Sequence, residues 1–274
     1  MWNVCGSEIR HSHVRVKIVV TSRSRNRPTP LLARKVERIA SVLEEHMGKP
    51  VQPRRKSAPL DSLIATLLSQ NTNDRNSHRA WLHLKREYPS WEAVADAPTR
   101  MIAKTIEVGG LKNQKAKRIK LILERIRREV GRYDLGFLKT KSNEEAMQYL
   151  SSMKGVGMKT AACVLVFSLG REVFPVDTHI HRLCNRLGLV QTTNAEQTFN
   201  AISTVIPNGS AYSIHVNLIR FGRKTCRSNN PLCSTCPLFD ECVYPDKVSH
   251  AAMAARPSGR SKRDVDFIIL NHVS

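Results

Sequence analysis

The chain is short of acidic residues and has no long apolar segment. Its 274 residues include 23 Asp and Glu against 44 Lys and Arg, which gives a net charge of +21 and an isoelectric point near 10.2. The longest mostly apolar run, Ala161 to Leu169, is far shorter than the ~20 residues that span a bilayer. The N-terminus has Ile18, Val19 and Val20 but no apolar stretch of the kind found in secretory signals. We therefore expect a soluble, cytoplasmic protein with no membrane partner.

Strand patterns and long-period repeats are also missing. No segment alternates convincingly between apolar and polar side chains, whereas apolar residues recur at helical spacing from Leu31 onward. The run Ala161 to Leu169 is apolar nearly all round, which predicts a central, buried helix. The sequence therefore predicts an all-α protein. Helices are expected from Leu31 to before Gly48, from Asp61 as N-cap to Leu68, and at 80–88, 99–107, 113–130, 143–150, 159–169, 179–187, 194–205 and 211–221.

The number and placing of the cysteines argue against a disulfide framework. Seven is an odd number, and four of the seven crowd together near the C-terminus, which indicates metal ligation in a reducing compartment. Their spacing is Cys226-x6-Cys233-x2-Cys236-x5-Cys242. Four thiolates suit a [4Fe–4S] cluster and also structural zinc. One C-x2-C pair between two longer arms favours the cluster, since zinc ribbons usually carry two such pairs. Cys163 and Cys184 lie in expected helices and are interpreted as ordinary buried thiols.

The excess of positive charge predicts a polyanionic partner, because Lys and Arg neutralise phosphates and release counterions. Charge alone does not distinguish a DNA enzyme from a ribosomal or chromatin protein, or from a basic soluble surface. Residues 1–30 hold several arginines and one acidic residue, and we interpret them as a disordered tail. A DNA-attracting arm and an organellar transit peptide are the alternatives. A second tail is expected at 247–274.

A glycine-containing turn lies between two expected helices, at Met153-Lys-Gly-Val-Gly-Met-Lys159-Thr160. Glycine permits backbone conformations and close approaches that side chains forbid. Such a turn presents N–H groups at a helix N-terminus, where phosphate binds readily. Lys159 falls in the first turn of the next helix, where the helix dipole and partial burial disfavour an ammonium. The sequence therefore predicts a neutral, nucleophilic amine; a lysine that contacts phosphate is the alternative.

Asp177 follows eighteen positions later, in the mostly apolar segment Phe174-Pro-Val-Asp177-Thr-His-Ile-His181. A carboxylate held beside a helix start in apolar surroundings is a candidate functional group. Its alternative role is to cap the helix that follows.

In combination, three motifs are specific. G-V-G-x-K-T-A at 155–161, V-D-T-H at 176–179 and the cysteine spacing, in this order and at these separations, resemble the helix-hairpin-helix glycosylases of the endonuclease III family over roughly residues 31–245. The resemblance implies an all-α fold of two parts with DNA bound in the cleft between them. One part is a six-helix barrel with the helix-hairpin-helix, here 52–171. The other joins 31–51 to 172–246 and carries the cysteines. The resemblance also favours [4Fe–4S] over zinc.

The resemblance assigns roles to individual residues. Lys159 matches the catalytic lysine and Asp177 the catalytic aspartate. Further residues are expected to contact the DNA. The hairpin supplies Gly155, Val156, Gly157 and Thr160, and a loop that fills the space of the extruded nucleotide supplies Gln70 and Asn71. A wedge loop supplies Leu111 and Lys112, and His179 lines the mouth of the site. The basic residues beside the cysteine loop should also face the DNA: Arg220, Arg223, Lys224 and Arg227. The alternatives are that Gln70 caps a helix end, that Leu111 is a small core or cap residue, and that His179 only orients the backbone.

The implied function is a nucleoid-associated, monomeric DNA glycosylase with AP lyase activity. It would bind double-stranded DNA containing a damaged base or an abasic site, and would excise an oxidised pyrimidine through a Schiff base on Lys159. The family commonly has Ala-Thr-Asp after the glutamine, where this chain has Asn71-Thr72-Asn73. The Phe174 to Thr178 segment is also similar to plant DEMETER-type demethylases. Mismatched thymine, uracil and 5-methylcytosine are therefore alternative substrates, and a non-catalytic DNA-binding protein and a zinc-stabilised structural protein are alternative classes.

Overall fold

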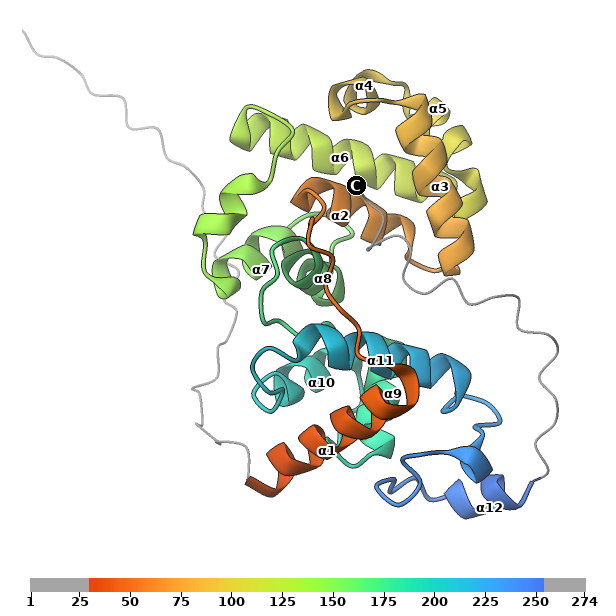
Figure 1. Cartoon of the computed structure of the whole chain (residues 1–274). Helices are drawn as coiled ribbons and strands as arrows, with labels where there is room; N and C mark the ends of the chain where they lie inside the picture. Colours follow the sequence, from red (N-terminus) through yellow and green to blue (C-terminus); the bar gives the residue numbers. More distant parts are fainter. Residues whose placement is uncertain (1–29, 254–274) are drawn as a thin grey trace, which may run out of the picture.

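A computed structural model describes residues 30–253, and its regular structure there is entirely helical (Figure 1). The predicted all-α fold is therefore confirmed. The α-helices are α1 (Pro30–Met47), α2 (Pro59–Leu68), α3 (Asp74–Glu87), α4 (Trp91–Asp96), α5 (Thr99–Thr105), α6 (Lys112–Val130), α7 (Asn143–Ser151), α8 (Met158–Ser168), α9 (Thr178–Arg186), α10 (Ala195–Ile202), α11 (Ala211–Lys224) and α12 (Lys247–Ala252). Short 3-10 turns lie at Glu107–Gly109, Gly136–Thr140 and Cys233–Thr235. No helix in this part of the chain is both long enough and apolar enough to cross a membrane.

The ends of the described region bear on the two expected tails. Residues 1–29 and 254–274 lie outside it, so most of both tails cannot be compared with the structure. The expected start of the second tail at residue 247 is wrong, because α12 begins there and packs on the turn at Cys233–Thr235.

Helices α2 to α8 share one hydrophobic core, and we call them the first lobe (upper part of Figure 1). Helices α2 and α7 pack directly on α8, and α5 packs on α6. Leu63, Leu67, Ile119, Leu150 and Leu165 are fully buried in this core. Their spacing within each helix is the apolar periodicity of the sequence, which places one face of each helix inward.

Helices α1, α9, α10 and α11, with the cysteine segment and α12, form the second lobe (lower part of Figure 1). Helix α11 contacts both α1 and α9. Leu43 of α1, Leu183 of α9, Ile202 of α10 and Phe221 of α11 are buried together in this second core. A segment far from the others in sequence, α1, therefore completes the lobe that holds the cysteines.

Helix α8 lies at the junction of the lobes, and every residue from Thr160 to Ser168 is buried. Its Cys163, Val166 and Phe167 pack against Tyr212 and Val216 of α11. The rings of Phe167 and Tyr212 meet edge to face, 5.6 Å apart between centroids. The prediction of a central, buried helix is confirmed.

Two of the predicted helix starts can be compared with the observed caps. Helix α2 begins at Pro59, so the prediction of Asp61 as its N-cap is wrong. Proline suits this first position because its missing N–H would be unpaired in any case. Asp61 instead accepts a 2.8 Å hydrogen bond from Nε1 of Trp91. Helix α7 was expected from residue 143, and Ser142 caps it in a reciprocal capping box with Glu145.

Candidate active site

The glycine turn joins α7 to α8 as expected, but its two glycines have different requirements. Gly155 has φ +87°, and a Cβ there would lie 2.5 Å from Cδ of Arg118. Gly157 has an ordinary φ of −93° and is the N-cap of α8, with nothing within 4 Å of a Cβ placed on it. The side chain of Val156 is buried in the first core. The turn therefore presents backbone rather than side chains to an approaching ligand.

Lys159 occupies the first turn of α8, as predicted, and is half-buried. Burial lowers the pKa of Lys159, but the acidic groups of Cys163, Asp177 and Asp74 around it raise the pKa by more, so that it lies above the ordinary value. This direction is opposite to the one that the sequence predicted from the helix dipole and burial. An amine that is to act as a nucleophile here must first give up a proton.

Cys163 is one helical turn beyond Lys159, and its thiol is fully buried. Burial raises the pKa of this thiol, while Lys159 nearby lowers it. The sequence interpretation of Cys163 as an ordinary core thiol missed this proximity. The i, i+4 spacing on one helix was the available signal.

Asp177 fills the capping role and also acts electrostatically on Lys159. It is the N-cap of α9, where its Oδ1 accepts a 2.9 Å hydrogen bond from the N–H of Ile180. Its charge also raises the pKa of Lys159. The backbone before it is held from α11, because Nδ1 of the fully buried His215 bonds the carbonyl oxygen of Pro175 at 2.9 Å. Burial lowers the pKa of His215 to about 4, so the ring is neutral near pH 7 and its Nδ1–H donates.

Gln70 ties its loop to the hairpin. Its Nε2 donates to the carbonyl oxygen of Gly155 at 3.1 Å and to Oγ1 of Thr160 at 3.2 Å. Its Oε1 accepts a 3.1 Å hydrogen bond from Nη1 of Arg118. Gln70 therefore lies beside the start of α8, and its amide bonds other groups of the protein. Thr160 is buried, and its hydroxyl bonds Gln70 and does not face solvent. Asn71, the next residue, is exposed with φ +52°.

The expected wedge residue Leu111 stands in an unusual position. It is 48% exposed and has φ +48°, a left-handed conformation that bulky residues rarely adopt. The neighbouring Lys112 is exposed and forms an ion pair with Glu107 at 2.7 Å. An apolar side chain held outward on a strained turn is unexplained by packing in the protein alone.

Lys115 links the Gln70 loop with the Leu111 loop. It is only 1% exposed, and its Nζ donates to the carbonyl oxygens of Leu68 at 2.7 Å and Gly109 at 2.8 Å. Burial, with a smaller contribution from Arg118, lowers its pKa to about 8. Lys115 was not among the residues that the sequence predicted at the site. Lys115 lies four residues before Ile119, on the buried face of α6, which was the available signal.

A polar chain runs from α9 to the first of the four clustered cysteines. Arg182 donates through Nη2 to the carbonyl oxygens of Gly222 and Cys226, each at 2.9 Å, and contacts Nδ1 of His179 at 3.2 Å. Burial lowers the pKa of His179. Arg186 contacts Sγ of Cys226 at 3.4 Å. Helix α9, which Asp177 caps, is therefore hydrogen-bonded to the cysteine segment. His179 takes part in this series of polar contacts.

The four cysteines expected as ligands share one cavity. Cys226, Cys233, Cys236 and Cys242 all line it, together with Phe239 and Lys247. The pKa of the Cys236 thiol is raised to about 11, mainly because the thiol is buried. Thiols in such a cavity ionise readily only when a metal centre compensates the charge.

The residues fit a multi-atom centre. Lys247 Nζ donates to the carbonyl oxygens of Phe239 and Cys242 at 2.9 and 2.7 Å, which closes the loop around the cavity. Among residues 30–253, no three His, Cys, Asp or Glu side chains meet as the ligands of one metal ion would. The four thiols that line the common pocket are nevertheless the donor set that a [4Fe–4S] cluster requires.

Comparison with known proteins gives the following matches. Residues 64–208 match the HhH-GPD superfamily of base excision DNA repair proteins. An Arabidopsis thaliana protein named as a candidate DNA glycosylase is 40% identical over 173 residues, 62% of this chain and 59% of that protein. Endonuclease III of Thermotoga maritima is 31% identical over 194 residues, 69% of this chain and 85% of the enzyme. The DNA glycosylase/AP lyase ROS1 of Arabidopsis thaliana is 28% identical over 186 residues, 61% of this chain but 13% of that protein.

The fold also has solved counterparts. A structure of a non-covalent endonuclease III–DNA complex superimposes with a TM-score of 0.66 at 23% identity, covering 77% of this chain and 95% of that one. At this identity the likeness establishes the fold alone. The family match covers more than half of the chain, and the Thermotoga relative is matched over more than two thirds of its length. The chain therefore belongs to the HhH-GPD superfamily of base excision DNA repair proteins, in the endonuclease III-like group.

Proposed function

We propose that this protein is a DNA glycosylase with AP lyase activity that excises an oxidised pyrimidine from double-stranded DNA. The observation that carries the proposal is the electrostatic interaction between Lys159, in the first turn of α8, and Asp177, the N-cap of α9. Asp177 acts on Lys159 strongly enough to change its pKa. A helix-hairpin-helix protein that only bound DNA would have no need for a carboxylate beside this amine. The names of endonuclease III and of ROS1 support the assignment.

The chemistry follows from the groups present. The target nucleotide is extruded from the duplex. As the bond from C1′ to the base breaks and the base leaves with the bonding electrons, the negative charge of Asp177 stabilises the positive charge that develops on the sugar. Lys159 then passes a proton to Asp177 as Nζ forms its bond to C1′. Ring opening leaves a Schiff base on Lys159. Loss of a proton from C2′ then expels the 3′ phosphate and nicks the strand.

The substrate is tested with a panel of duplexes, each with one modified base in a 5′-labelled strand. We expect a strand break without alkali at an oxidised pyrimidine. If the enzyme instead cuts faster at 5-methylcytosine, or at a thymine or uracil that lies opposite guanine, the same reaction would be assigned to that base. The observation that favours that second candidate is the sequence Asn71-Thr72-Asn73 after Gln70, where the family commonly has Ala-Thr-Asp. If the base is released but the strand breaks only after alkali is added, the lyase assignment would be contradicted.

Leu111 provides a test of how the duplex is opened. Flipping a nucleotide costs a few kcal/mol, and an apolar wedge that enters the stack offsets that cost. We expect Leu111→Ala to slow single-turnover excision at least several-fold more on a duplex than on the same lesion in single-stranded DNA, where no stack is opened. Leu82→Ala is a matched control, since Leu82 is 50% exposed on α3. An equal effect on both substrates would show that Leu111 has only a structural role.

The cysteine cavity leads us to propose a [4Fe–4S] cluster held by Cys226, Cys233, Cys236 and Cys242. When bound, the cluster supplies a rigid anchor for the segment that Arg182 and Arg186 connect to α9.

The cluster is tested by composition. Purified protein should be brown and contain iron and acid-labile sulfide in equal amounts. Cys233→Ser should lose visible absorbance and most of the iron, because a cluster of this type requires all four thiolates. Cys184→Ala should keep both, since buried Cys184 belongs to the core rather than the cavity. A protein that contained zinc and no sulfide would refute the proposal.

A further inference from the structure

The two candidate catalytic residues belong to different lobes. Lys159 lies in the first turn of α8, in the first lobe, whereas Asp177 begins α9, in the second lobe. Residues 169–176 connect the two helices and contain no regular structure. The separation of the amine and the carboxylate therefore depends on how the lobes are held against each other.

The apolar junction packs along α8 beyond Lys159. Cys163, Val166 and Phe167, which pack on Tyr212 and Val216, are four, seven and eight residues beyond Lys159. At the rise of an α-helix they lie about 6 to 12 Å along the axis from it. The junction therefore begins one helical turn beyond Lys159, and the first turn of α8, which carries Lys159, is not part of it.

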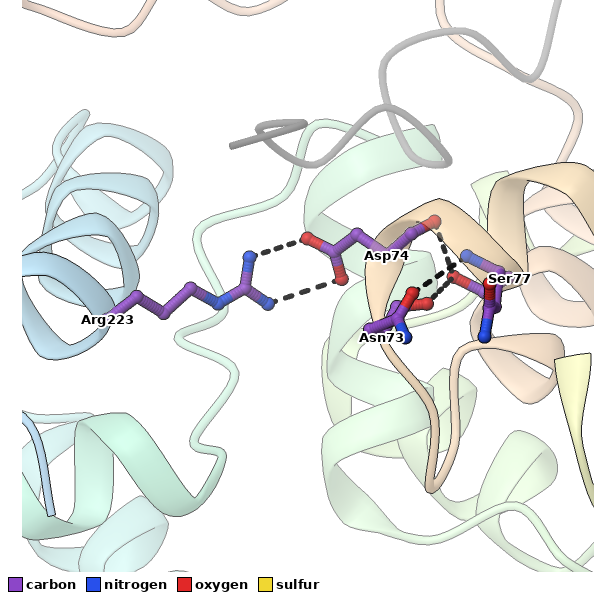
Figure 2. A network of polar contacts seen from close by, with 5 residues as sticks. Asn73, Asp74, Ser77 and Arg223 are labelled. Carbon is purple, nitrogen blue, oxygen red and sulfur yellow. Dashed lines mark hydrogen bonds and ion pairs between the residues drawn. The ribbon is translucent and has the colours of Figure 1, made fainter. Parts of the chain in front are cut away.

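An ion pair supplies a contact between the lobes near that end. Arg223, in the last turn of α11, donates through Nη1 and Nη2 to the two carboxylate oxygens of Asp74, at 2.5 and 3.2 Å. Figure 2 shows the guanidinium reaching from α11 to the start of α3 with both bonds in place. The two side chains are 34% and 24% exposed. Two-point, partly buried pairs of this geometry are the ion pairs that contribute measurably, unlike most surface pairs.

Both ends of the pair are rigidly placed. Asn73 caps α3 by accepting from the N–H of Asn76 at 2.9 Å, and Oγ of Ser77 donates to the carbonyl oxygens of Asn73 and Asp74 (Figure 2). Asp74 is thus fixed in the first turn of α3. On the other side, α11 is buried from Ala211 to Ile219. Because little freedom remains in either backbone, the pair holds one helix end against the other.

The pair also reaches the site electrostatically. Asp74 is one of the groups that raise the pKa of Lys159. Arg223 contributes to lowering the pKa of His179, although burial is the larger cause. Both members therefore lie close enough to the candidate catalytic groups for the contact to matter there.

We propose that Asp74 and Arg223 are positioning residues that hold the two lobes at the separation at which Asp177 meets Lys159. The inference rests on the proposed function, because it concerns the alignment of that reaction's two catalytic groups.

The pair is tested by a double-mutant cycle. Asp74→Asn removes the charge, and Arg223→Lys keeps a cation near the DNA but cannot make two parallel bonds. Single-turnover excision is measured with saturating enzyme on the duplex that the parent cuts fastest, so that weaker DNA binding does not enter. Each protein is compared at the plateau of its own pH profile, so that a change in the pKa of Lys159 does not enter either. We expect each variant to be about tenfold slower and the double variant to be no slower than either, because a broken pair cannot be broken again. Arg75→Gln, an exposed neighbour of Asp74, is the control and should match the parent. A parent-like rate in either single variant, or multiplied losses in the double variant, would overturn the proposal.

The pH profile separates alignment from a direct effect on the amine. Lys159 is surrounded by Asp74, Cys163 and Asp177, and it acts in turn on buried His215. Asp74 raises the pKa of Lys159, so Asp74→Asn should move the rising limb of the rate to lower pH as well as lower its plateau. Arg223→Lys leaves that carboxylate in place and should lower the plateau without this shift. A shifted limb with an unchanged plateau in Asp74→Asn would mean that Asp74 acts on Lys159 alone.

Hydrogen exchange gives a readout that needs no activity. We expect the amides of residues 169–176 to exchange faster in both variants, while the global unfolding temperature falls by no more than a few degrees. If the parent excises no base but exchange rises in both variants, the proposed function fails and the contact between lobes stands. If the parent is active and neither rates nor exchange change, the inference alone fails.

Discussion

Replacing Lys159 with glutamine is expected to abolish covalent trapping of the protein on DNA. Borohydride reduces a Schiff base to a stable amine, so the parent should give an adduct with the proposed substrate that survives denaturing electrophoresis. Lys159→Gln has no amine to attack C1′ and should give none, and strand cutting should fall below detection. Because the Lys159 side chain is half-buried, thermal unfolding of the variant is measured alongside.

Lys154 offers a matched control for this experiment. It lies in the same hairpin and is exposed, five residues before Lys159. Lys154→Gln removes one positive charge from the same turn and should still be trapped. Robust trapping of Lys159→Gln would move the nucleophile to another amine and refute its assignment to α8.

The pH dependence of the trapping rate follows from the electrostatics of Lys159. Its pKa is raised, because the acidic groups around it outweigh the effect of burial. Nucleophilic attack needs the neutral amine, so the single-turnover rate of the parent should rise with pH up to the raised pKa. A rate that is flat from neutral to alkaline pH would indicate that proton transfer from Lys159 does not limit the reaction.

Asp177→Asn is expected to reduce turnover about a hundredfold or more while the protein stays folded. Asparagine keeps the size of the side chain and also caps helices, so the bond to the N–H of Ile180 can be retained. What is lost is the negative charge that stabilises the sugar and accepts the proton of Lys159. Removing this charge also lowers the pKa of Lys159, since Asp177 raises it. The residual activity should therefore reach its plateau at lower pH than in the parent.

Asp177→Ala separates the cap from the chemistry. It removes both the charge and the capping oxygen, so it should lose about 0.5–2 kcal/mol of unfolding free energy that Asp177→Asn retains. The two variants should be similarly inactive. Full turnover in Asp177→Asn would mean that Asp177 serves α9 as a cap and nothing more.

The sequence by itself determined the parts of this protein that depend on residues close together in the chain. The helical periodicity of residues such as Leu32, Val36, Ile39 and Leu43 predicted α1, because one turn of helix brings these positions to one face. The nearly uniform apolar run after Lys159 predicted the buried α8. The spacing of four cysteines identified the segment that folds around a common cavity. Gly155, at φ +87°, is where the turn needs glycine.

Only the tertiary structure decided what meets what across long separations. Lys115 reads as one more basic residue on α6, yet the fold buries it against carbonyl oxygens of two loops. The direction of the pKa shift of Lys159 could not be read from the helix dipole and burial alone. Cys163 on the same helix contributes most to raising the pKa, and the carboxylates of Asp177 and Asp74 add to it from the starts of α9 and α3. Asp74 and Arg223 are 149 positions apart and show no pattern that pairs them. Helix periodicity is a short-range property of the chain, but pKa values and ion pairs depend on distances through space, which the packing of the two lobes sets.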